Sequence, residues 1–280
     1  MLSLHTNAAA LSAQNAISKT QSNLSTSMTR LSTGYRINSA MDDAAGLQIA
    51  SRLKAQSSGM NVAMRNTQNA TALMQTAEGA LDEVSNIVVR MKDLATQAAD
   101  SGSTTKDKTA MHAEFAELGK ELVNIMDNTS FGGAQLLKAT TGTLATAMNF
   151  QIGADAAEVM TVTLTGGLTA VQTSVTALST TASVATAAGA TTAIGTLSTA
   201  IDNIGALRSS LGASANRLEH VNNNLANIST NTKQATGLIM DVDFAAESAN
   251  MTSSQMLMQA STAMLKQSNS MSSMVMSLLQ

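Results

Sequence analysis

The chain contains no proline in 280 residues, and this absence constrains its fold more than any other feature. Proline interrupts helix interiors, because its ring removes an N–H donor and clashes with the preceding turn. A chain without proline that is rich in alanine, serine, threonine, glutamine and methionine therefore favours long, uninterrupted helices. It also suits a chain that must thread and refold without slow prolyl isomerisation.

Composition and charge exclude several classes of protein. The absence of cysteine excludes a disulfide framework and a thiolate zinc site. A net charge of -3, with 16 basic residues spread along the chain, lacks the cationic field of a nucleic-acid binder. The longest stretch without charged residues, 159–201, is too rich in threonine, serine and glycine to span a membrane. Residues 1–19 have no basic region before an apolar run, so no cleavable secretory signal is predicted.

Helical periodicity begins near the N-terminus. A first helix is predicted where apolar residues recur at spacings of four and three: Leu24, Met28 and Leu31. A break is expected at 32–34, followed by Ser39 as the N-cap of a second helix. Asp42 and Asp43 would then lie in the first turn of that helix, which is expected to stop at Gly59.

The clearest periodicity lies over residues 77–98. Seven apolar residues alternate spacings of four and three over three heptads: Ala77, Leu81, Val84, Val88, Met91, Ala95 and Ala98. This pattern is typical of the a/d seam of a coiled coil. It stops at a turn-like cluster, 100–103, and a further helix is predicted from about Lys106 to Met126.

The middle of the chain changes period. Five residues alternate with polar or small ones in two short runs: Met148, Phe150, Ile152, Val162 and Leu164. They predict a β-hairpin with a turn at 153–155, and Gly166 and Gly167 are interpreted as another turn. The threonine-rich, low-complexity stretch 171–193 carries no structural prediction.

Helical periodicity returns over 194–204 and 218–228 and continues to the C-terminus. The last stripe consists of six residues: Leu257, Ala260, Met264, Met271, Val275 and Leu278. The predicted fold is therefore mainly α, with long antiparallel helical arms that form a coiled-coil rod, a small β-hairpin region and a short variable insert.

The arms are not expected to be stable alone. Two seam residues per heptad contribute about 4–6 kcal/mol when buried, whereas ordering seven residues costs roughly 10 kcal/mol. The terminal stripes are diluted with alanine, serine and methionine. The arms are therefore expected to stay disordered until another surface covers them, and the methionines of the last arm are interpreted as an adaptable packing face.

No catalytic, cofactor-binding or metal-binding residues are predicted. His5, His112 and His220 lie far apart, and none has the spacing of a zinc-binding HExxH helix. No glycine-rich phosphate loop occurs, and Asp42 with Asp43 is explained by a first helical turn. An enzyme is therefore not expected.

Two stretches identify a family. Residues 30–40 (RLSTGYRINSA) followed by 42–46 (DDAAG) resemble the N-terminal signature of bacterial flagellin. The C-terminal half is similar to the same family at 208–213, at 243–245 and at the ending 277–280. The motifs occur in the family's order over about 1–165 and 194–280, and the short middle suggests a compact flagellin, compatible with the lateral type.

The resemblance implies five parts and an inner tube formed by the terminal arms. The parts are 1–42, the N-terminal arm of the inner-tube domain; 43–138, the N-terminal helices of the rod domain; 139–193, the β-hairpin and solvent-facing variable region; 194–242, the C-terminal helix of the rod domain; and 243–280, the C-terminal arm. The implied polymerisation residues are Leu24, Met28, Leu31, Leu257, Met264, Met271, Val275 and Leu278.

The resemblance also implies partners and a location. A flagellin polymerises with itself, and the expected location is the extracellular flagellar filament used for motility, reached through the type III export apparatus without a cleavable signal. A flagellin chaperone, the filament cap and hook-associated junction proteins are further expected partners; no cofactor, nucleic acid or membrane span is expected.

A host partner is implied as well. Arg90, Leu94 and Glu114 match residues at which the host toll-like receptor for flagellin recognises this family. Met91 and Ala95 face the predicted seam, so Arg90 and Leu94 are expected beside it and available to an outside partner. Two alternatives to a filament subunit stay open: a hook–filament junction protein, which shares the terminal-arm design, and a coiled-coil adaptor, which the heptads alone permit.

Overall fold

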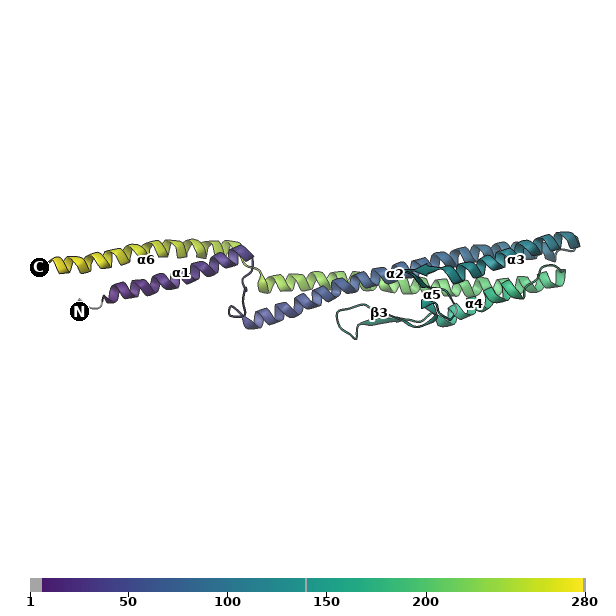
Figure 1. Cartoon of the computed structure of the whole chain (residues 1–280), viewed down its shortest axis with the longest axis horizontal. Helices are drawn as coiled ribbons and strands as arrows, with labels where there is room; N and C mark the ends of the chain where they lie inside the picture. The colour runs from purple at the N-terminus through teal and green to yellow at the C-terminus, as the bar shows by residue number, and fades with distance from the viewer. Residues whose placement is uncertain (1–6, 139, 279–280) are drawn as a thin grey trace. The chain divides into compact units, whose positions relative to one another are not determined.

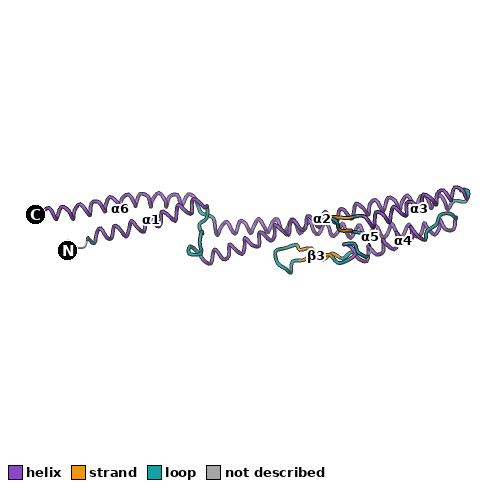
Figure 2. Tube along the Cα trace, viewed as in Figure 1, coloured by secondary structure: helices purple, strands orange, loops and turns teal. Residues whose placement is uncertain are grey.

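The computed structural model describes residues 7–138 and 140–278, with the backbone alone at 272, 273 and 275–278. Its long helices are α1 (Ala8–Thr33), α2 (Ala44–Ala99), α3 (Thr105–Asn128), α4 (Thr165–Thr180), α5 (Ala187–Met240) and α6 (Phe244–Leu278) (Figure 1). The remaining elements are β1 (Ser130–Phe131), β2 (Ala134–Gln135), the short 3-10 helix η1 (Thr143–Ala145), β3 (Met148–Gln151) and β4 (Val159–Val162) (Figure 2). The predicted mainly-α fold with a small β region is confirmed.

The chain forms two compact units. Residues 1–56 and 230–280 make up one, called here the arm unit, and residues 57–229 make up the other, called the rod unit. The predicted domain boundaries at 42/43 and 242/243 fall in the segments that link α1 to α2 and α5 to α6. Those boundaries stay predictions.

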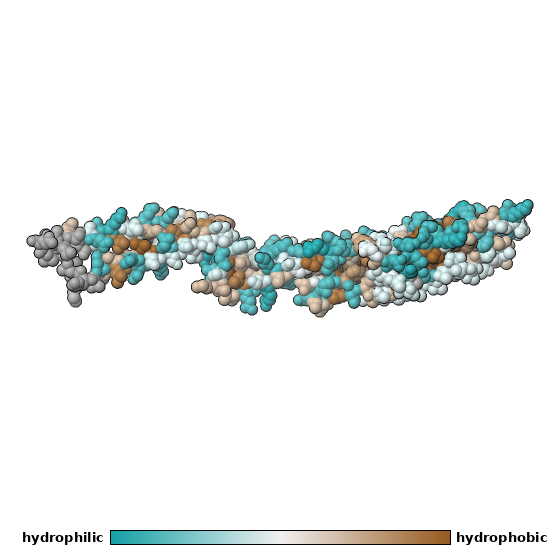
Figure 3. Space-filling model, in the orientation of Figure 1, coloured by the Kyte–Doolittle hydropathy of each residue, from teal (hydrophilic) through white to brown (hydrophobic). Residues whose placement is uncertain are grey.

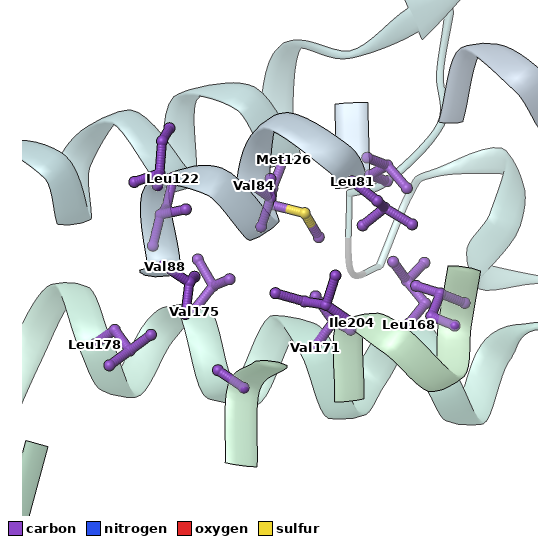
Figure 4. Close-up of a cluster of buried hydrophobic side chains, with 14 of the residues drawn as sticks. Leu81, Val84, Val88, Leu122, Met126, Leu168, Val171, Val175, Leu178 and Ile204 are labelled. Atoms are coloured by element: carbon purple, nitrogen blue, oxygen red, sulfur yellow. The ribbon is translucent and has the colours of Figure 1, made fainter. Parts of the chain in front are cut away.

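The rod unit contains the main hydrophobic core. All seven residues of the predicted heptad seam, Ala77 to Ala98, are buried on α2. Figure 4 shows that side chains from four helices converge here, and the labelled ones are Leu81, Val84 and Val88 of α2, Leu122 and Met126 of α3, Leu168, Val171, Val175 and Leu178 of α4, and Ile204 of α5. Because helices cover α2 on more than one side, this part of the coiled coil is a helical bundle rather than a two-stranded pair.

Polar contacts fix the register of α2 against α5. Asn222 Nδ2 donates to Thr67 Oγ1 at 2.8 Å and to the Met64 carbonyl at 3.1 Å. Arg208 Nη1 lies 2.9 Å from Asp82 Oδ1. Low numbers on α2 thus face high numbers on α5, so the two helices run antiparallel, as predicted.

Helix α3 begins at a capping box. Thr104 Oγ1 accepts from the Asp107 N–H at 3.3 Å, and Asp107 Oδ2 accepts from the Thr104 N–H at 3.0 Å. These reciprocal bonds satisfy two N–H groups that the first turn of a helix leaves without intrahelical partners. The helix predicted from about Lys106 to Met126 is confirmed, with one extra residue at its start and two at its end.

The predicted hairpin is confirmed between β3 and β4, which pair antiparallel with Met148 opposite Val162 and Gln151 opposite Val159. A second, shorter hairpin joins β1 to β2 through Gly132 and Gly133, at φ 59° and 86°. Such positive φ angles are readily adopted by glycine because it has no Cβ.

Two sequence expectations are wrong, and one stretch left without a prediction turns out to be largely helical. Gly59 does not end a helix, because α2 continues through it, and a Cβ there would lie only 2.8 Å from the Ala154 Cβ. Gly166 and Gly167 lie inside the first turn of α4 rather than in a separate turn. Much of the stretch left without a structural prediction, 171–193, is also helical. Its apolar residues at three- and four-residue spacings bury against α2 and α3, although threonines dilute the pattern.

The N-cap prediction for the second helix also needs correction. Asp43, not Ser39, caps α2, because its Oδ1 accepts from the Gly46 N–H at 2.8 Å. Asp42 instead closes the preceding turn, where its Oδ2 accepts from the N–H groups of Asn38 at 3.0 Å and Ser39 at 2.9 Å. Asp42 therefore stabilises the turn, and its neighbour Asp43 stabilises the start of α2.

The arm unit is organised by a backbone junction. Gly34 ends α1 in a left-handed conformation (φ 77°) and donates its N–H to the Arg30 carbonyl at 2.9 Å. Tyr35 then forms an antiparallel bridge with Asp241, and the Val242 N–H donates to the Gly34 carbonyl at 3.0 Å. The two linking segments are thus tied together, and α1 and α6 run side by side from this junction (Figure 1).

Candidate assembly surface

Helices α1 and α6 form an antiparallel pair. Near one end Asn7 Nδ2 donates to Ser268 Oγ at 3.2 Å, and near the other Arg30 Nη1 lies 3.7 Å from Glu247 Oε2. The covered residues recur at spacings of three and four on both helices, as in a two-stranded coiled coil. On α1 they are Ala10, Ala13, Ile17, Thr20, Leu24, Ser27 and Leu31, and on α6 they are Glu247, Met251, Ser254, Met258, Ser261, Leu265 and Ser268.

The seam of this pair is half polar. Along α6 one heptad position is apolar, and the other is serine three times in succession: Ser254, Ser261 and Ser268. Burying a leucine or methionine contributes about 1.5–3 kcal/mol, whereas a serine contributes almost nothing. The contacts between α1 and α6 are therefore expected to offset less of the cost of ordering the helices than the rod-unit seam does.

A charged pair lies near the junction end of the seam. Glu247 is buried, and its carboxylate is 3.7 Å from the nearest guanidinium nitrogen of Arg30, beyond hydrogen-bond distance. Arg30 Nε is itself buried without a hydrogen-bond partner. Because removing charges from water is costly, this pair specifies the alignment of α1 with α6 more than it stabilises them.

The side of α6 beside the seam carries an exposed apolar stripe. Leu257, Met264 and Met271 lie seven residues apart on one face, and all three are exposed. We call these three residues the α6 outer stripe; Met256 is exposed next to it. Figure 3 shows apolar surface interspersed with polar surface along the arm helices. Large exposed apolar side chains in a row are typical of an interaction surface.

The predicted polymerisation residues fall into three environments. Leu24 is buried and Leu31 half-buried in the seam between α1 and α6, whereas Met28 is exposed. The α6 outer stripe contains the other residues whose side chains the structure describes, and Val275 and Leu278 lie outside the described side chains. The predicted stripe on α1 thus divides between the seam and the exposed surface, whereas the predicted residues of α6 whose side chains are described are all exposed.

Sequence reasoning missed a second exposed apolar group, at the junction. Tyr35, Met41, Leu238 and Phe244 are all exposed in or beside the segments that link the helices. Tyr35 and Phe244 are two of only five aromatic residues in the chain. The only feature of the sequence that could have pointed to these residues is their position in or beside short linking segments, where helical periodicity does not apply. The same region carries Asp42, whose pKa is held below 3.8 by hydrogen bonds from the Ser39 N–H and then the Asn38 N–H.

The three residues of the implied receptor site lie together in the rod unit but differ in accessibility. Arg90 donates from Nε and Nη2 to Glu114 Oε1 at 3.1 and 2.7 Å, and both side chains are about half exposed. Leu94 is only 3% exposed, so the expectation that it is accessible is wrong in this structure. The cause is the bundle: Ile87 and Leu94, seven residues apart, form a second buried row beside the main seam of α2.

Within residues 7–138 and 140–278, no three histidine, cysteine, aspartate or glutamate side chains are placed to hold a metal ion together. In that same part of the chain, every helix is too short or too polar to cross a membrane.

Comparison with known proteins identifies relatives of both halves. Two family models match: the bacterial flagellin N-terminal helical region over residues 4–142, and the bacterial flagellin C-terminal helical region over residues 194–279. A flagellin of Halalkalibacterium halodurans is 37% identical over 254 residues, which cover 90% of this chain and 90% of that protein. The B-type flagellin of Pseudomonas aeruginosa is 46% identical over 163 residues, 58% of this chain. The chain covers 33% of that protein and 42% of the polar flagellin F of Vibrio parahaemolyticus.

Solved structures agree. The crystal structure of Bacillus cereus flagellin superposes with a TM-score of 0.51 at 34% identity, over 57% of this chain and 88% of that one. A putative flagellar hook-associated protein from Vibrio parahaemolyticus gives a TM-score of 0.56 over 71% of this chain and 99% of that one, but at 15% identity this likeness concerns the fold alone. Because a relative that matches over nine-tenths of both chains is 37% identical, and both family models match in order, the chain belongs to the bacterial flagellin family.

Proposed function

We propose that this chain is a structural subunit that polymerises with copies of itself into the bacterial flagellar filament used for motility. The observation that carries the proposal is the α1–α6 pair, which has a half-polar seam and leaves the α6 outer stripe exposed. A soluble chain gains nothing from such an arrangement unless other copies cover the stripe.

The energetics favour assembly through the arms. Each large apolar side chain that a neighbouring copy covers contributes about 1.5–3 kcal/mol. The outer stripe supplies three such side chains on α6, and the exposed Leu11 and Met28 supply two more on α1. Assembly thus adds burial that the isolated pair lacks, which supports the expectation that the arms become fully ordered only in the polymer.

The remaining partners belong to the same proposal. Export through the flagellar apparatus, a chaperone on the C-terminal arm, the filament cap and hook-associated junction proteins fit a chain that has no proline and no cysteine to hinder threading. The location is then the extracellular filament, and the role is structural rather than enzymatic.

Recognition by the host toll-like receptor for flagellin is a separate proposal at Arg90, Leu94 and Glu114. The half-exposed Arg90–Glu114 pair offers the accessible groups, and the buried Leu94 supports α2 beneath them. Receptor signalling should fall for Arg90→Ala in a variant that keeps the native circular dichroism spectrum. Full signalling by a folded Arg90→Ala/Glu114→Ala variant would exclude this site.

Electron microscopy of purified monomer after seeding tests the filament proposal. The full chain should form long filaments, whereas a chain lacking residues 244–280 should form none. A sharper pair of variants keeps the length: Leu257→Asp/Met264→Asp should block filaments, and Thr262→Asp, exposed on the other side of the α6 seam, should not.

The same experiment separates the alternative functions. A hook–filament junction protein or an adaptor would remain monomeric or form short complexes under conditions that seed filaments. If the full chain never polymerises, one of those functions replaces the filament subunit, although family membership stands.

A further inference from the structure

The methionines of this chain differ widely in exposure. On α6, Met256, Met264 and Met271 are 59%, 66% and 56% exposed. In the rod core, Met74 is 1% exposed, and Met91 and Met126 are fully buried. Thioether sulfur is oxidised where an oxidant reaches it, so the exposed α6 methionines are chemically different from those of the core.

The three α6 methionines are not part of the contact between α1 and α6. The covered positions on that stretch of α6 are Ser254, Met258, Ser261, Leu265 and Ser268, and the three exposed methionines occupy none of them. A polar group added at Met256, Met264 or Met271 therefore leaves the seam intact. It changes only how the outer face of α6 packs against the molecule that covers it.

The chemistry is a two-electron oxygen transfer. A lone pair of the thioether sulfur attacks one oxygen of hydrogen peroxide; the S–O bond forms, the O–O bond breaks, and water leaves after proton transfer. The sulfur is oxidised by two electrons and the peroxide is reduced by two. The product, methionine sulfoxide, is polar and chiral, whereas the original side chain is flexible and apolar.

We propose that Met256, Met264 and Met271 are peroxide-modification sites that decide whether a free subunit can assemble. In the unassembled chain hydrogen peroxide converts them to sulfoxides, and the modified face no longer packs against a second copy. In a filament, neighbouring copies cover the same side chains and protect them. The assembly half of this inference rests on the proposed polymerisation, whereas the modification half does not.

Peptide mapping by mass spectrometry tests the modification. After brief exposure of native monomer to hydrogen peroxide, sulfoxide should accumulate at Met256, Met264 and Met271 on the order of ten-fold faster than at Met74, Met91 and Met126, because the core sulfurs are reached only through unfolding. Equal rates in the two groups would overturn the inference. This measurement needs no polymerisation.

Seeded polymerisation tests the consequence. Oxidised monomer should lose filament formation while its circular dichroism spectrum stays native, and treatment with methionine sulfoxide reductases for both epimers should restore it. The filament yield of a Met256→Leu/Met264→Leu/Met271→Leu variant should be the same without peroxide and after peroxide treatment. The control variant Met28→Leu/Met41→Leu, which removes two exposed methionines elsewhere, should stay peroxide-sensitive.

The outcomes separate the two proposals. If untreated monomer does not polymerise, the proposed function fails and peptide mapping alone decides the modification. If untreated and oxidised monomers polymerise equally, or if the leucine variant remains peroxide-sensitive, the assembly role of the three methionines is wrong while polymerisation stands. If the leucine variant fails to polymerise even untreated, the reductase rescue of the native sequence decides, and failure of rescue overturns the inference.

Discussion

The arm pair and the rod core carry the same spacing of covered residues but fill it differently. Along α2, every position from Ala77 to Ala98 in the three–four repeat is apolar, and further helices close over it. Along α6, every second covered position from Ser254 to Ser268 is a serine, and α1 packs against this seam. The repeat sets the geometry of a helix pair, and the residues within it set whether the pair is stable by itself.

This contrast is the physical basis of the proposal that the arms, unlike the rod core, depend on neighbouring copies. The rod core buries large side chains of α2, α3, α4 and α5 in one cluster (Figure 4). The arm pair buries a single narrow seam and leaves large apolar residues such as Leu257 and Met264 exposed. Apolar surface that a subunit keeps exposed is the surface that association can bury.

The largest expected effect is in the rod core. Leu122→Ala removes a fully buried side chain and should lower the free energy of unfolding by about 2–5 kcal/mol, measured by urea titration with circular dichroism. The matched control Leu257→Ala, on the exposed face of α6, should change it by no more than about 0.5 kcal/mol. Equal losses at the two leucines would break the comparison between arm and rod.

A second prediction strengthens the arm. Ser254→Leu/Ser261→Leu gives the α6 seam two more apolar residues and should stabilise the arm pair by about 1–2 kcal/mol per substitution. The measurement is hydrogen exchange of α1 and α6 amides, with slower exchange expected. Ser253→Leu, exposed on the face of α6 away from the seam, serves as the control. Unchanged exchange in the double variant would show that serine is not what weakens the pair.

A third prediction concerns the stability of the fold at low pH, because a carboxyl in each unit has a lowered pKa. The Thr104 hydroxyl and then its N–H hold the pKa of Asp107 below 3.8 in the rod unit, and backbone N–H groups do the same for Asp42 in the arm unit. A carboxyl with a lowered folded pKa stabilises the fold above its unfolded pKa, and this stability is lost as pH falls through the folded value.

Below about pH 4, the native chain should therefore lose stability more steeply than the Asp107→Asn variant does in urea titrations. Thr104→Ala removes the largest cause of the Asp107 shift and should flatten the same part of the curve. Asp42→Asn should leave that curve unchanged and alter only the acid-dependent hydrogen exchange near the start of α2. Identical slopes for native chain and Asp107→Asn would refute the assignment.

The smallest expected effect is at the surface of the rod. Arg90→Ala breaks a half-exposed ion pair with Glu114 and should cost about 0.5 kcal/mol or less, because water and salt screen such pairs. Leu94→Ala, one turn along the same helix but buried, should cost several times more. If the urea midpoints of the two variants coincide, the pair contributes more than surface ion pairs usually do, or Leu94 is less well packed than the structure indicates.

Local patterns were predictable where one periodicity dominated. The heptads from Ala77 to Ala98, the helix near 106–126 and the alternating hairpin residues each repeat within a few turns or strands, so neighbouring positions report the same face. The two flagellin signature stretches were also readable as sequence. Residues 165–180 were not, because threonines hid the buried leucines and valines of α4.

The exposure of the implied polymerisation residues was not predictable from the sequence. Sequence placed polymerisation residues on both terminal helices, and the structure puts Leu24 in the seam and Leu257 outside it. Leu94 is buried rather than accessible for a related reason, since α2 is covered from more sides than it would be in a two-stranded pair. In both cases the missing information was which other helix lies alongside.

Sequence by itself determined the helical periods, the hairpin and the family. Because it contains no proline, it also allows helices of 56 and 54 residues. Tertiary structure alone decided which of two apolar rows on α6 meets α1 and which stays free for a neighbour. The physical reason is that a helix repeats its side chains all around its axis, so several faces carry a three–four spacing at once. Only the position of the partner helix, fixed here by the junction of Gly34 and Tyr35 with Asp241 and Val242, selects the face that becomes buried.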